Sequence, residues 1–247
     1  MRNIKEFDER YAIKTFYTDR LDRYEEGCGD IVSFLGARNP VIFRADQTHS
    51  ANVCVLSDNG PKIEYTDETY TLSHKEGYDS IVTGLSDTLL IIRTADCTPI
   101  YMYDNTSGTI AMVHSGWRGT AGSIAVRTVE VMSRCFSACP GDIAVAIGPC
   151  ICKDCYEVGQ DVYDLYSDKF GEDIVKAVFE MRPDGKFNLD VKKTVMIDLI
   201  KNAGILPENI IDTGICTYES SELASYRRDG SMDRTAQMQS GIIRLHV

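Results

Sequence analysis

Histidine is scarce in this 247-residue sequence, which contains four of them and a single tryptophan. Any metal chemistry is therefore limited to what His49, His74, His114 and His246 can support together with other ligand types. With only 19 glycines and 7 prolines, and apolar residues recurring along the chain, a disordered chain is excluded. No run approaches the roughly 20 apolar residues of a membrane helix, and the N-terminal MRNIKEFDERY lacks the apolar core of a signal peptide. We expect a soluble, cytoplasmic protein.

Basic residues are also few, since 26 Lys and Arg against 37 Asp and Glu leave a formal charge of −11. An acidic surface repels phosphate backbones, so we expect no nucleic-acid partner. The sequence contains no internal repeat, low-complexity segment or linker, and 43% hydrophobic residues are enough for a sizeable core. We therefore predict one domain over residues 1–247.

The nine cysteines are an odd number with irregular spacing. Such a pattern does not indicate a disulfide framework, and in a reducing cytoplasm most of these residues are expected to be thiols packed as small hydrophobes.

Strand and helix patterns alternate without the strict β-α-β order, which predicts an α+β fold with helices flanking sheet. A turn at residues 105–108 (NTSG) predicts an antiparallel hairpin of strands 88–93 and 109–113, with 99–103 continuing the first arm or forming its own strand. The expected strands are 11–16, 31–35, 41–43, 88–93, 109–113, 143–147, 210–216 and 242–245. The expected helices are 123–136, 157–170 and 189–203, the last ending at Gly204.

Three apolar strands each end near a residue that can bind a metal: His49, Cys97 and His114. The intervals of 48 and 17 residues are long, so the spacing alone also fits unrelated polar residues at strand ends. A His/Cys/His set suits Zn²⁺ and leaves a fourth position open, as in catalytic rather than structural zinc sites.

Directly after His114 comes Gly116-Trp117-Arg118-Gly119, before an expected helix. The glycines let the backbone approach a ligand closely. Arg118 can offer a planar pair of donors to phosphate near the helix start, or be a surface charge. For Trp117 we favour core packing over base stacking.

A second arginine-rich segment lies near the C-terminus, in the polar loop after Ser225. Its members are Arg227, Arg228 and Arg234. In an acidic protein these residues favour an anionic substrate, but ion pairs with Asp229 and Asp233 explain them equally well.

Two further patterns resemble zinc sites. His74-x-Glu76 and Cys152-x-x-Cys155 together are similar to the signature of zinc nucleobase deaminases, but the proline is out of register and we interpret the match as chance. A structural zinc on Cys150, Cys152 and Cys155 lacks an evident fourth ligand, so we expect reduced thiols.

Taken together, six segments resemble the YfiH/laccase-domain family, also called multicopper polyphenol oxidase-like or purine nucleoside phosphorylase of the FAMIN type. The resemblance implies a layered α/β/β/α fold similar to that of toxin-type cysteine hydrolases. It also implies zinc ligands at His49, Cys97 and His114. The segments are QTHSANV (47–53), YDSIVTG (78–84), TADCTPIYMYD (94–104), VHSGWRGT (113–120), AIGPCICKDCYEVG (146–159) and CTYESSELASYRRDG (216–230).

The resemblance further implies phosphorolysis of adenosine, inosine, guanosine and S-methyl-5′-thioadenosine, and deamination of adenosine. His49, Cys97 and His114 would be catalytic, while Arg118 and Arg227 would bind substrate or phosphate. One alternative is copper-dependent phenol oxidation. Four histidines are too few for a four-copper cluster, so we regard bound copper as adventitious. Another alternative is a cysteine hydrolase, including an amidase that edits peptidoglycan precursors, with Cys97 as nucleophile and His114 as base. A non-enzymatic binding module is the least favoured.

Overall fold

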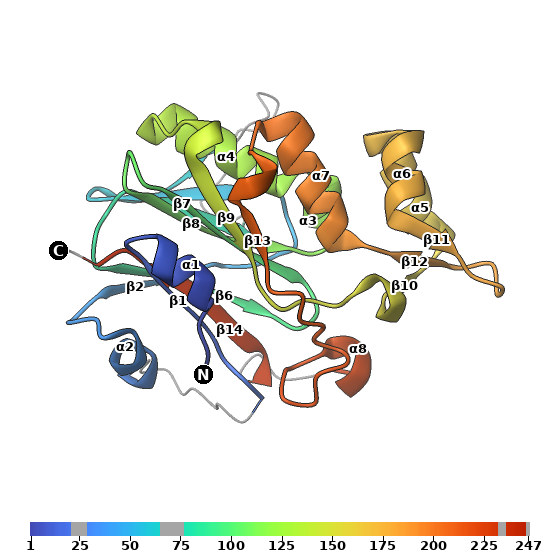
Figure 1. Cartoon of the computed structure of the whole chain (residues 1–247), viewed down its shortest axis with the longest axis horizontal. Coiled ribbons are helices and arrows are strands. Elements are labelled where there is room, and N and C mark those ends of the chain that lie inside the picture. The colour runs from blue at the N-terminus through green and yellow to red at the C-terminus, as the bar shows by residue number, and fades with distance from the viewer. Residues whose placement is uncertain (21–28, 65–76, 232–235, 246–247) are drawn as a thin grey trace.

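The computed structural model describes residues 1–20, 29–64, 77–231 and 236–245 (Figure 1). Within these residues the fold is α+β, as predicted, and the strands form three sheets. The sheet that carries most of the core has the order β13-β9-β7-β8-β5-β3-β4, with β13/β9 and β3/β5 parallel and the other pairs antiparallel. Its strands are β3 (Val53–Ser57), β4 (Gly60–Glu64), β5 (Ser80–Thr83), β7 (Thr98–Asp104), β8 (Thr109–Ser115), β9 (Ile143–Ile147) and β13 (Ile210–Asp212).

A four-stranded sheet of order β1-β14-β6-β2 packs on one face of the seven-stranded sheet, and a small sheet of order β10-β12-β11 lies at one end. The four strands are β1 (Lys14–Tyr17), β2 (Val41–Arg44), β6 (Thr88–Thr94) and β14 (Met238–Ile243), and the small sheet has β10 (Glu157–Val158), β11 (Phe179–Met181) and β12 (Phe187–Leu189).

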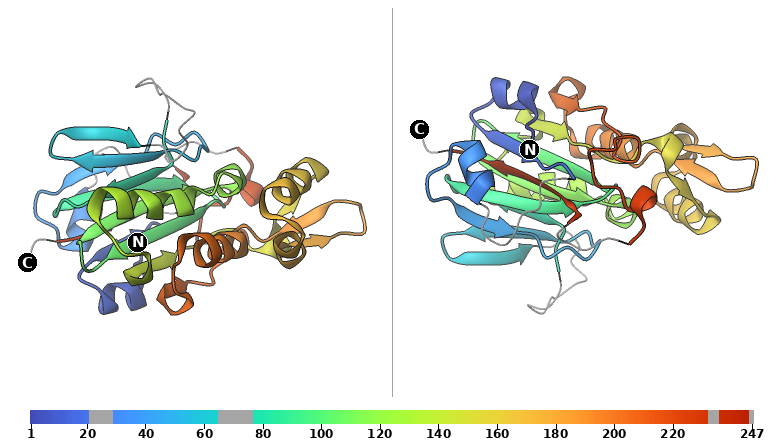
Figure 2. Two further views of the ribbon diagram at one scale, coloured as in Figure 1. Left: turned by 90° about the horizontal axis from the view of Figure 1, so that it is seen from above. Right: turned by 90° about the horizontal axis from the view of Figure 1, so that it is seen from below.

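Helices cover the outer faces of this pair of sheets (Figures 1 and 2). They are α1 (Lys5–Arg10), α2 (Gly29–Leu35), α3 (Trp117–Ala121), α4 (Ile124–Phe136), α5 (Gln160–Phe170), α6 (Glu172–Val178), α7 (Val191–Ala203) and α8 (Tyr226–Asp229), with short 3₁₀ turns η1 (Pro140–Asp142), η2 (Lys153–Cys155) and η3 (Pro207–Asn209). No helix of the described residues is both long and apolar enough to cross a membrane.

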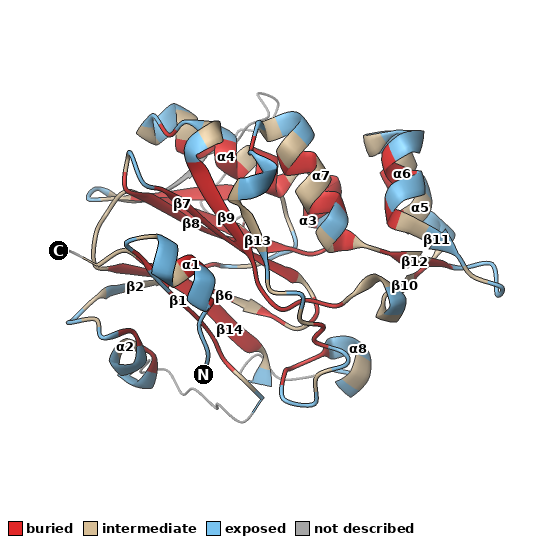
Figure 3. Ribbon diagram, in the orientation of Figure 1, coloured by how far each residue is buried: buried red, intermediate tan, exposed pale blue. Residues whose placement is uncertain are grey.

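Burial on both faces explains why the central strands are continuously apolar (Figure 3). In β7, Ile100 and Met102 pack toward α4 and α7, while Tyr101 and Tyr103 pack toward the four-stranded sheet. The same alternation recurs in the four-stranded sheet, whose outer face packs on α2. Two apolar layers therefore meet at the seven-stranded sheet and hold its strand ends in fixed positions.

The structure corrects three of the predicted elements. Residues 31–35 lie in helix α2 rather than in a strand, because a short apolar run fits one face of a helix equally well. Residues 88–93 do not pair with 109–113, because the hairpin partner of β8 is β7, which is a strand of its own, whereas β6 lies in the other sheet. The helix expected from residue 157 begins at Gln160, after the short strand β10.

Candidate active site

The change of sheet between β6 and β7 places Cys97 at the start of β7. The connection is very short and passes through Asp96, whose φ of 85° lies in the left-handed region that non-glycine residues rarely adopt. Because β7 and β8 are antiparallel with Pro99 opposite His114, the first residues of β7 lie beside the end of β8. Cys97 and His114 are therefore neighbours although 17 residues separate them.

His49 reaches the same point from the loop between β2 and β3, with its backbone at a φ of 60°. The ligand atoms of His49, Cys97 and His114 lie within 4.8 Å of one another. His114 is buried, whereas His49 is exposed. A Cβ at Gly116 would lie 3.0 Å from Cys97 Sγ and 3.2 Å from His49 Cδ2, so the glycine is required for this close approach. The structure thus brings the three predicted residues together.

Asp79, just before β5, organises both histidines and was not singled out from the sequence. Its carboxylate accepts hydrogen bonds from the backbone N–H groups of Thr48, His49 and Ser50 at 3.1, 3.0 and 2.6 Å. His114 Nδ1 lies 2.7 Å from Asp79 Oδ1. This contact leaves His114 Nε2 to face the cluster, which is the second-shell arrangement found at many metal-binding histidines.

The electrostatics of the cluster favour a thiolate at Cys97. Burial alone would raise the pKa of Cys97, but the neighbouring His114 and His49 outweigh it and lower this pKa to about 6. Burial would lower the pKa of His114, but Cys97 and Asp79 together raise it to about 9. For Asp79 itself, the hydrogen bonds from His114 and Ser50 overcome burial and lower the pKa. The site therefore offers a thiolate, the form of cysteine that acts as nucleophile or metal ligand.

A cavity of about 520 Å³ opens onto this cluster. That volume is within the range of small-molecule sites. Cations and aromatic rings share its wall, a combination suited to an anion beside a planar ring. They are Arg93, Arg118, Arg227, Trp117, Tyr156 and Tyr226.

Arg118 lies on the cavity wall, but within the five-residue helix α3 rather than ahead of a long helix as we expected. Its guanidinium stacks over the ring of Trp117 at 3.9 Å. Trp117 itself both packs against a buried cluster and faces the cavity. Core packing, which we favoured for this residue, is thus only part of its environment.

Arg227 also lines the cavity, and its guanidinium lies over the Tyr156 ring at 5.2 Å and donates to the Glu157 carbonyl at 3.0 Å. Its backbone N–H donates to Asp96 at 2.7 Å. The neighbouring Arg228 has a different environment, since it donates to backbone carbonyls of residues 217, 218, 220 and 223 and to Asp229. Arg228 therefore braces the loop, while Arg227 is available at the cavity.

The cysteines of the 150–155 segment do not form the set considered from the sequence. Cys150 is buried, and burial raises the pKa of its thiol to about 12. Cys152 and Cys155 instead lie beside Cys216 and Glu219, with all four ligand atoms within 4.8 Å of one another. This second group is a candidate metal site. The remaining sequence candidates His74, Glu76, Asp233, Arg234 and His246 lie outside the described residues.

Comparison with known proteins places the chain in a family. Residues 14–244 match the family model described as "Multi-copper polyphenol oxidoreductase laccase". The chain therefore belongs to this family.

Relatives with names suggest a chemistry. The chain is 35% identical over 185 residues to "Adenosine deaminase RL5" of an unknown prokaryotic organism, covering 74% of this chain and 68% of the relative. It is 31% identical over 242 residues to a purine nucleoside phosphorylase of Clostridium acetobutylicum, covering 92% and 94%. The crystal structure of hypothetical protein YfiH of Bacillus licheniformis has the same fold, with a TM-score of 0.81, 24% identity and coverage of 99% and 96% of the two chains.

Proposed function

We propose that this chain is a zinc-dependent purine nucleoside phosphorylase that also deaminates adenosine. The observation that carries the proposal is the convergence of His49, Cys97 and His114 on a cavity with arginines and aromatic rings. The names of the relatives support nucleosides as the substrate class. The proposed substrates are adenosine, inosine, guanosine and S-methyl-5′-thioadenosine, with phosphate as the second substrate of phosphorolysis.

The donor set fits a zinc ion. Bonds of about 2.0–2.3 Å in a tetrahedral site space the ligand atoms about 3.3–3.8 Å apart. A small inward movement from the observed spacing of at most 4.8 Å would satisfy this requirement. A zinc ion held by these residues would supply Lewis-acid catalysis and leave room for a substrate. Copper would be accommodated by the same N/S donors, and we regard its binding as adventitious.

The other cavity residues divide the substrates between them. Trp117, Tyr156 and Tyr226 offer ring faces for the purine, and Tyr226 is 58% exposed, so its ring is accessible to a ligand. Arg118 and Arg227 would hold phosphate against the anomeric carbon. The developing oxocarbenium-like charge on the ribose would be stabilised by that nearby anion.

The test measures two reactions of the purified full chain: phosphate-dependent release of hypoxanthine from inosine, and release of ammonia from adenosine. We expect both to require the metal, so that chelation stops them and added Zn²⁺ restores them. Absence of both reactions from zinc-loaded protein would contradict the proposal.

A second candidate is a cysteine hydrolase, including an amidase acting on peptidoglycan precursors. The contact of Asp79 with His114 Nδ1 at 2.7 Å, beside Cys97, is the orientation that a Cys–His–Asp nucleophilic site requires. Chelation separates the two candidates, because a cysteine hydrolase keeps its activity without metal. Alkylation of Cys97 would stop both, so it does not discriminate between them.

We propose that residues 1–247 form one domain, with layers in the α/β/β/α order of toxin-type cysteine hydrolases. The apolar cluster shared between the two large sheets supports this view, since neither sheet buries its inner face alone. The proposed partners are small molecules in the cytoplasm, with no role for nucleic acid or membrane.

A further inference from the structure

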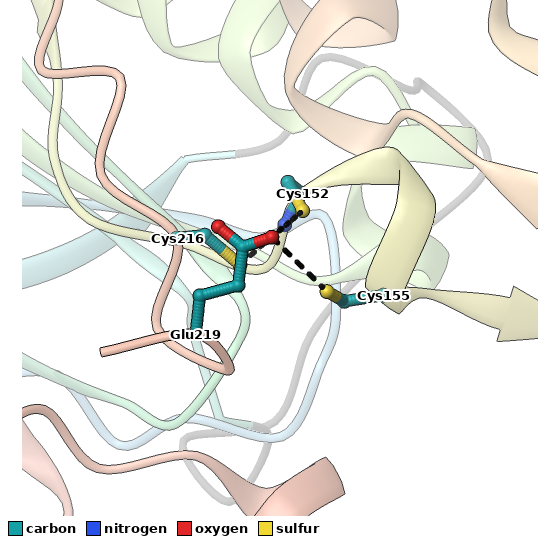
Figure 4. Close-up of side chains that lie close together, drawn as sticks. All are labelled: Cys152, Cys155, Cys216 and Glu219. Carbon is teal, nitrogen blue, oxygen red and sulfur yellow. Dashed lines mark hydrogen bonds between the residues drawn. The ribbon is translucent and has the colours of Figure 1, made fainter. Parts of the chain in front are cut away.

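A second group of metal-binding side chains lies away from the three-residue cluster, on two loops. It consists of two pairs, each spaced i, i+3: Cys152 with Cys155, and Cys216 with Glu219. In Figure 4 the Glu219 carboxylate points toward the sulfur atoms of the three cysteines. Its Oε1 lies 4.0 Å from Cys152 Sγ and 3.8 Å from Cys155 Sγ. Paired i, i+3 ligands on two turns are the usual construction of structural zinc sites.

Backbone hydrogen bonds hold each pair in place. The Cys155 N–H donates to the Cys152 carbonyl at 3.2 Å, which closes the η2 turn, and the Ser220 N–H donates to the Cys216 carbonyl at 3.1 Å. The two turns are also joined, because the Cys152 N–H donates to Cys216 Sγ at 3.3 Å and Cys150 bridges to Cys216 as in a parallel sheet. The ligand geometry therefore does not depend on free side-chain sampling.

Two simpler explanations fit less well. A disulfide would use two of the cysteines and leave the third thiol and the carboxylate without a role. Thiols serving only as packing would not need Glu219, which is exposed yet turned toward the sulfur atoms rather than outward. A tetrahedral zinc spaces sulfur ligands about 3.8 Å apart, close to the spacing of at most 4.8 Å found here. We propose that Cys152, Cys155, Cys216 and Glu219 bind a structural zinc ion.

This second zinc would fix one wall of the cavity. Tyr156, which lines the cavity, directly follows Cys155. Thr217, which follows Cys216, donates to Asp96 Oδ1 at 2.7 Å, and the Arg227 N–H donates to Asp96 Oδ2 at 2.7 Å. The zinc would therefore join the two loops that carry Tyr156 and Arg227. Its loss should weaken substrate binding while leaving the three-residue cluster intact.

The proposal is tested by counting zinc in the full chain, purified without chelators, by elemental analysis. We expect two zinc ions in the wild type and one each in Cys155→Ser and Cys97→Ala. The matched control is Cys139→Ser, at an exposed free cysteine outside both clusters, which should keep two. Co²⁺ loaded into Cys97→Ala provides a second readout, because its thiolate charge-transfer band can come only from the second cluster and should disappear in the Cys97→Ala/Cys155→Ser double variant.

The two metal sites fail separately in this experiment. One zinc in the wild type that is lost in Cys97→Ala and kept in Cys155→Ser overturns the second site only. One zinc lost in Cys155→Ser and kept in Cys97→Ala supports the second site and overturns the catalytic one. A disulfide among the three cysteines of zinc-free native protein, detected as a 2 Da lower mass, also overturns the second site.

A surface variant keeps the test decisive if Cys155→Ser does not fold. Glu219→Gln alters only an exposed side chain and removes one charged ligand. We expect it to release zinc to a chelating dye about tenfold faster than the wild type, by the size of effects seen when metal sites are weakened. An unchanged release rate overturns the role of Glu219 and with it the four-ligand site.

Discussion

The two clusters of metal-binding side chains differ in number of ligands and in surroundings. His49, Cys97 and His114 provide three ligands and open onto a cavity. The second cluster provides four ligands, and none of them lines that cavity. Three protein ligands with a free position are typical of catalytic zinc, and four are typical of structural zinc.

Their supports differ in the same direction. The open cluster is built from three segments far apart in the sequence, brought together by strand register and by the Asp79 carboxylate. The four-ligand cluster is built from two short turns. We infer that a catalytic site here depends on the tertiary fold, whereas the structural site depends mainly on local chain geometry. The following variants test this contrast, from the largest expected effect to the smallest.

Cys97→Ala should abolish both phosphorolysis and deamination, because a methyl group cannot replace a thiolate ligand. Assays with inosine and adenosine, together with a melting curve, check this expectation. Cys139→Ser is the control for loss of a thiol. Near-normal activity in folded Cys97→Ala would remove the open cluster from the mechanism.

Arg118→Ala should lower phosphorolysis by about 10- to 150-fold, since a hydrogen bond to a charged group contributes roughly 1.5–3 kcal/mol. The KM for phosphate should rise more than the KM for nucleoside, and deamination, which uses water, should change less. Arg118→Lys should also be impaired, because it loses the paired donors. Arg38→Ala is a control at an exposed arginine outside the cavity lining. Equal losses of both activities with a lowered melting temperature would instead show that Arg118 braces its loop.

Asp79→Asn should reduce zinc affinity and activity about 10- to 100-fold, the usual effect of removing a second-shell carboxylate. An amide has one acceptor oxygen, so it cannot serve His114 and the N–H groups of the loop 48–50 at once. Competition with a zinc chelator measures the affinity. If the affinity is unchanged while activity falls, Asp79 acts on His114 as a base rather than as a metal ligand.

Arg227→Lys should have the smallest effect, about 2- to 10-fold on KM, because it gives up one hydrogen bond to a carbonyl, worth roughly 0.5–1.5 kcal/mol. The backbone bond to Asp96 remains, so the loop should keep its place. Steady-state kinetics with varied phosphate measure the change. A fall in kcat with unchanged KM would argue against a binding role for Arg227.

Much of the fold could be predicted where the local signal agreed with the tertiary structure. Helix α7 (Val191–Ala203) was predicted within two residues, because apolar periodicity was followed by Gly204, which adopts a φ of 75°. Residues 31–35 were assigned to a strand because five apolar-rich residues fit either structure, and only packing against the four-stranded sheet makes them a helix. The hairpin was misassigned because sequence does not show that the chain changes sheet at Asp96.

For the candidate site, the three residues at strand ends could be proposed because their residue types are unusual at such positions. Asp79 could not, because a carboxylate in Tyr78-Asp79-Ser80 looks like any polar residue before a strand. Glu219 is a similar case. Its role depends on a contact with Cys152 and Cys155, more than 60 residues away, and the composition of its own loop gives no sign of this contact.

The central claim is that the open cluster carries out the reaction with a bound metal. The most direct measurement is phosphate-dependent release of hypoxanthine from inosine, made in parallel on wild type and on folded Cys97→Ala at saturating Zn²⁺. We predict turnover in the wild type that disappears without phosphate, and none in the variant. Equal turnover in the two proteins, or wild-type turnover that does not need phosphate, would contradict the account.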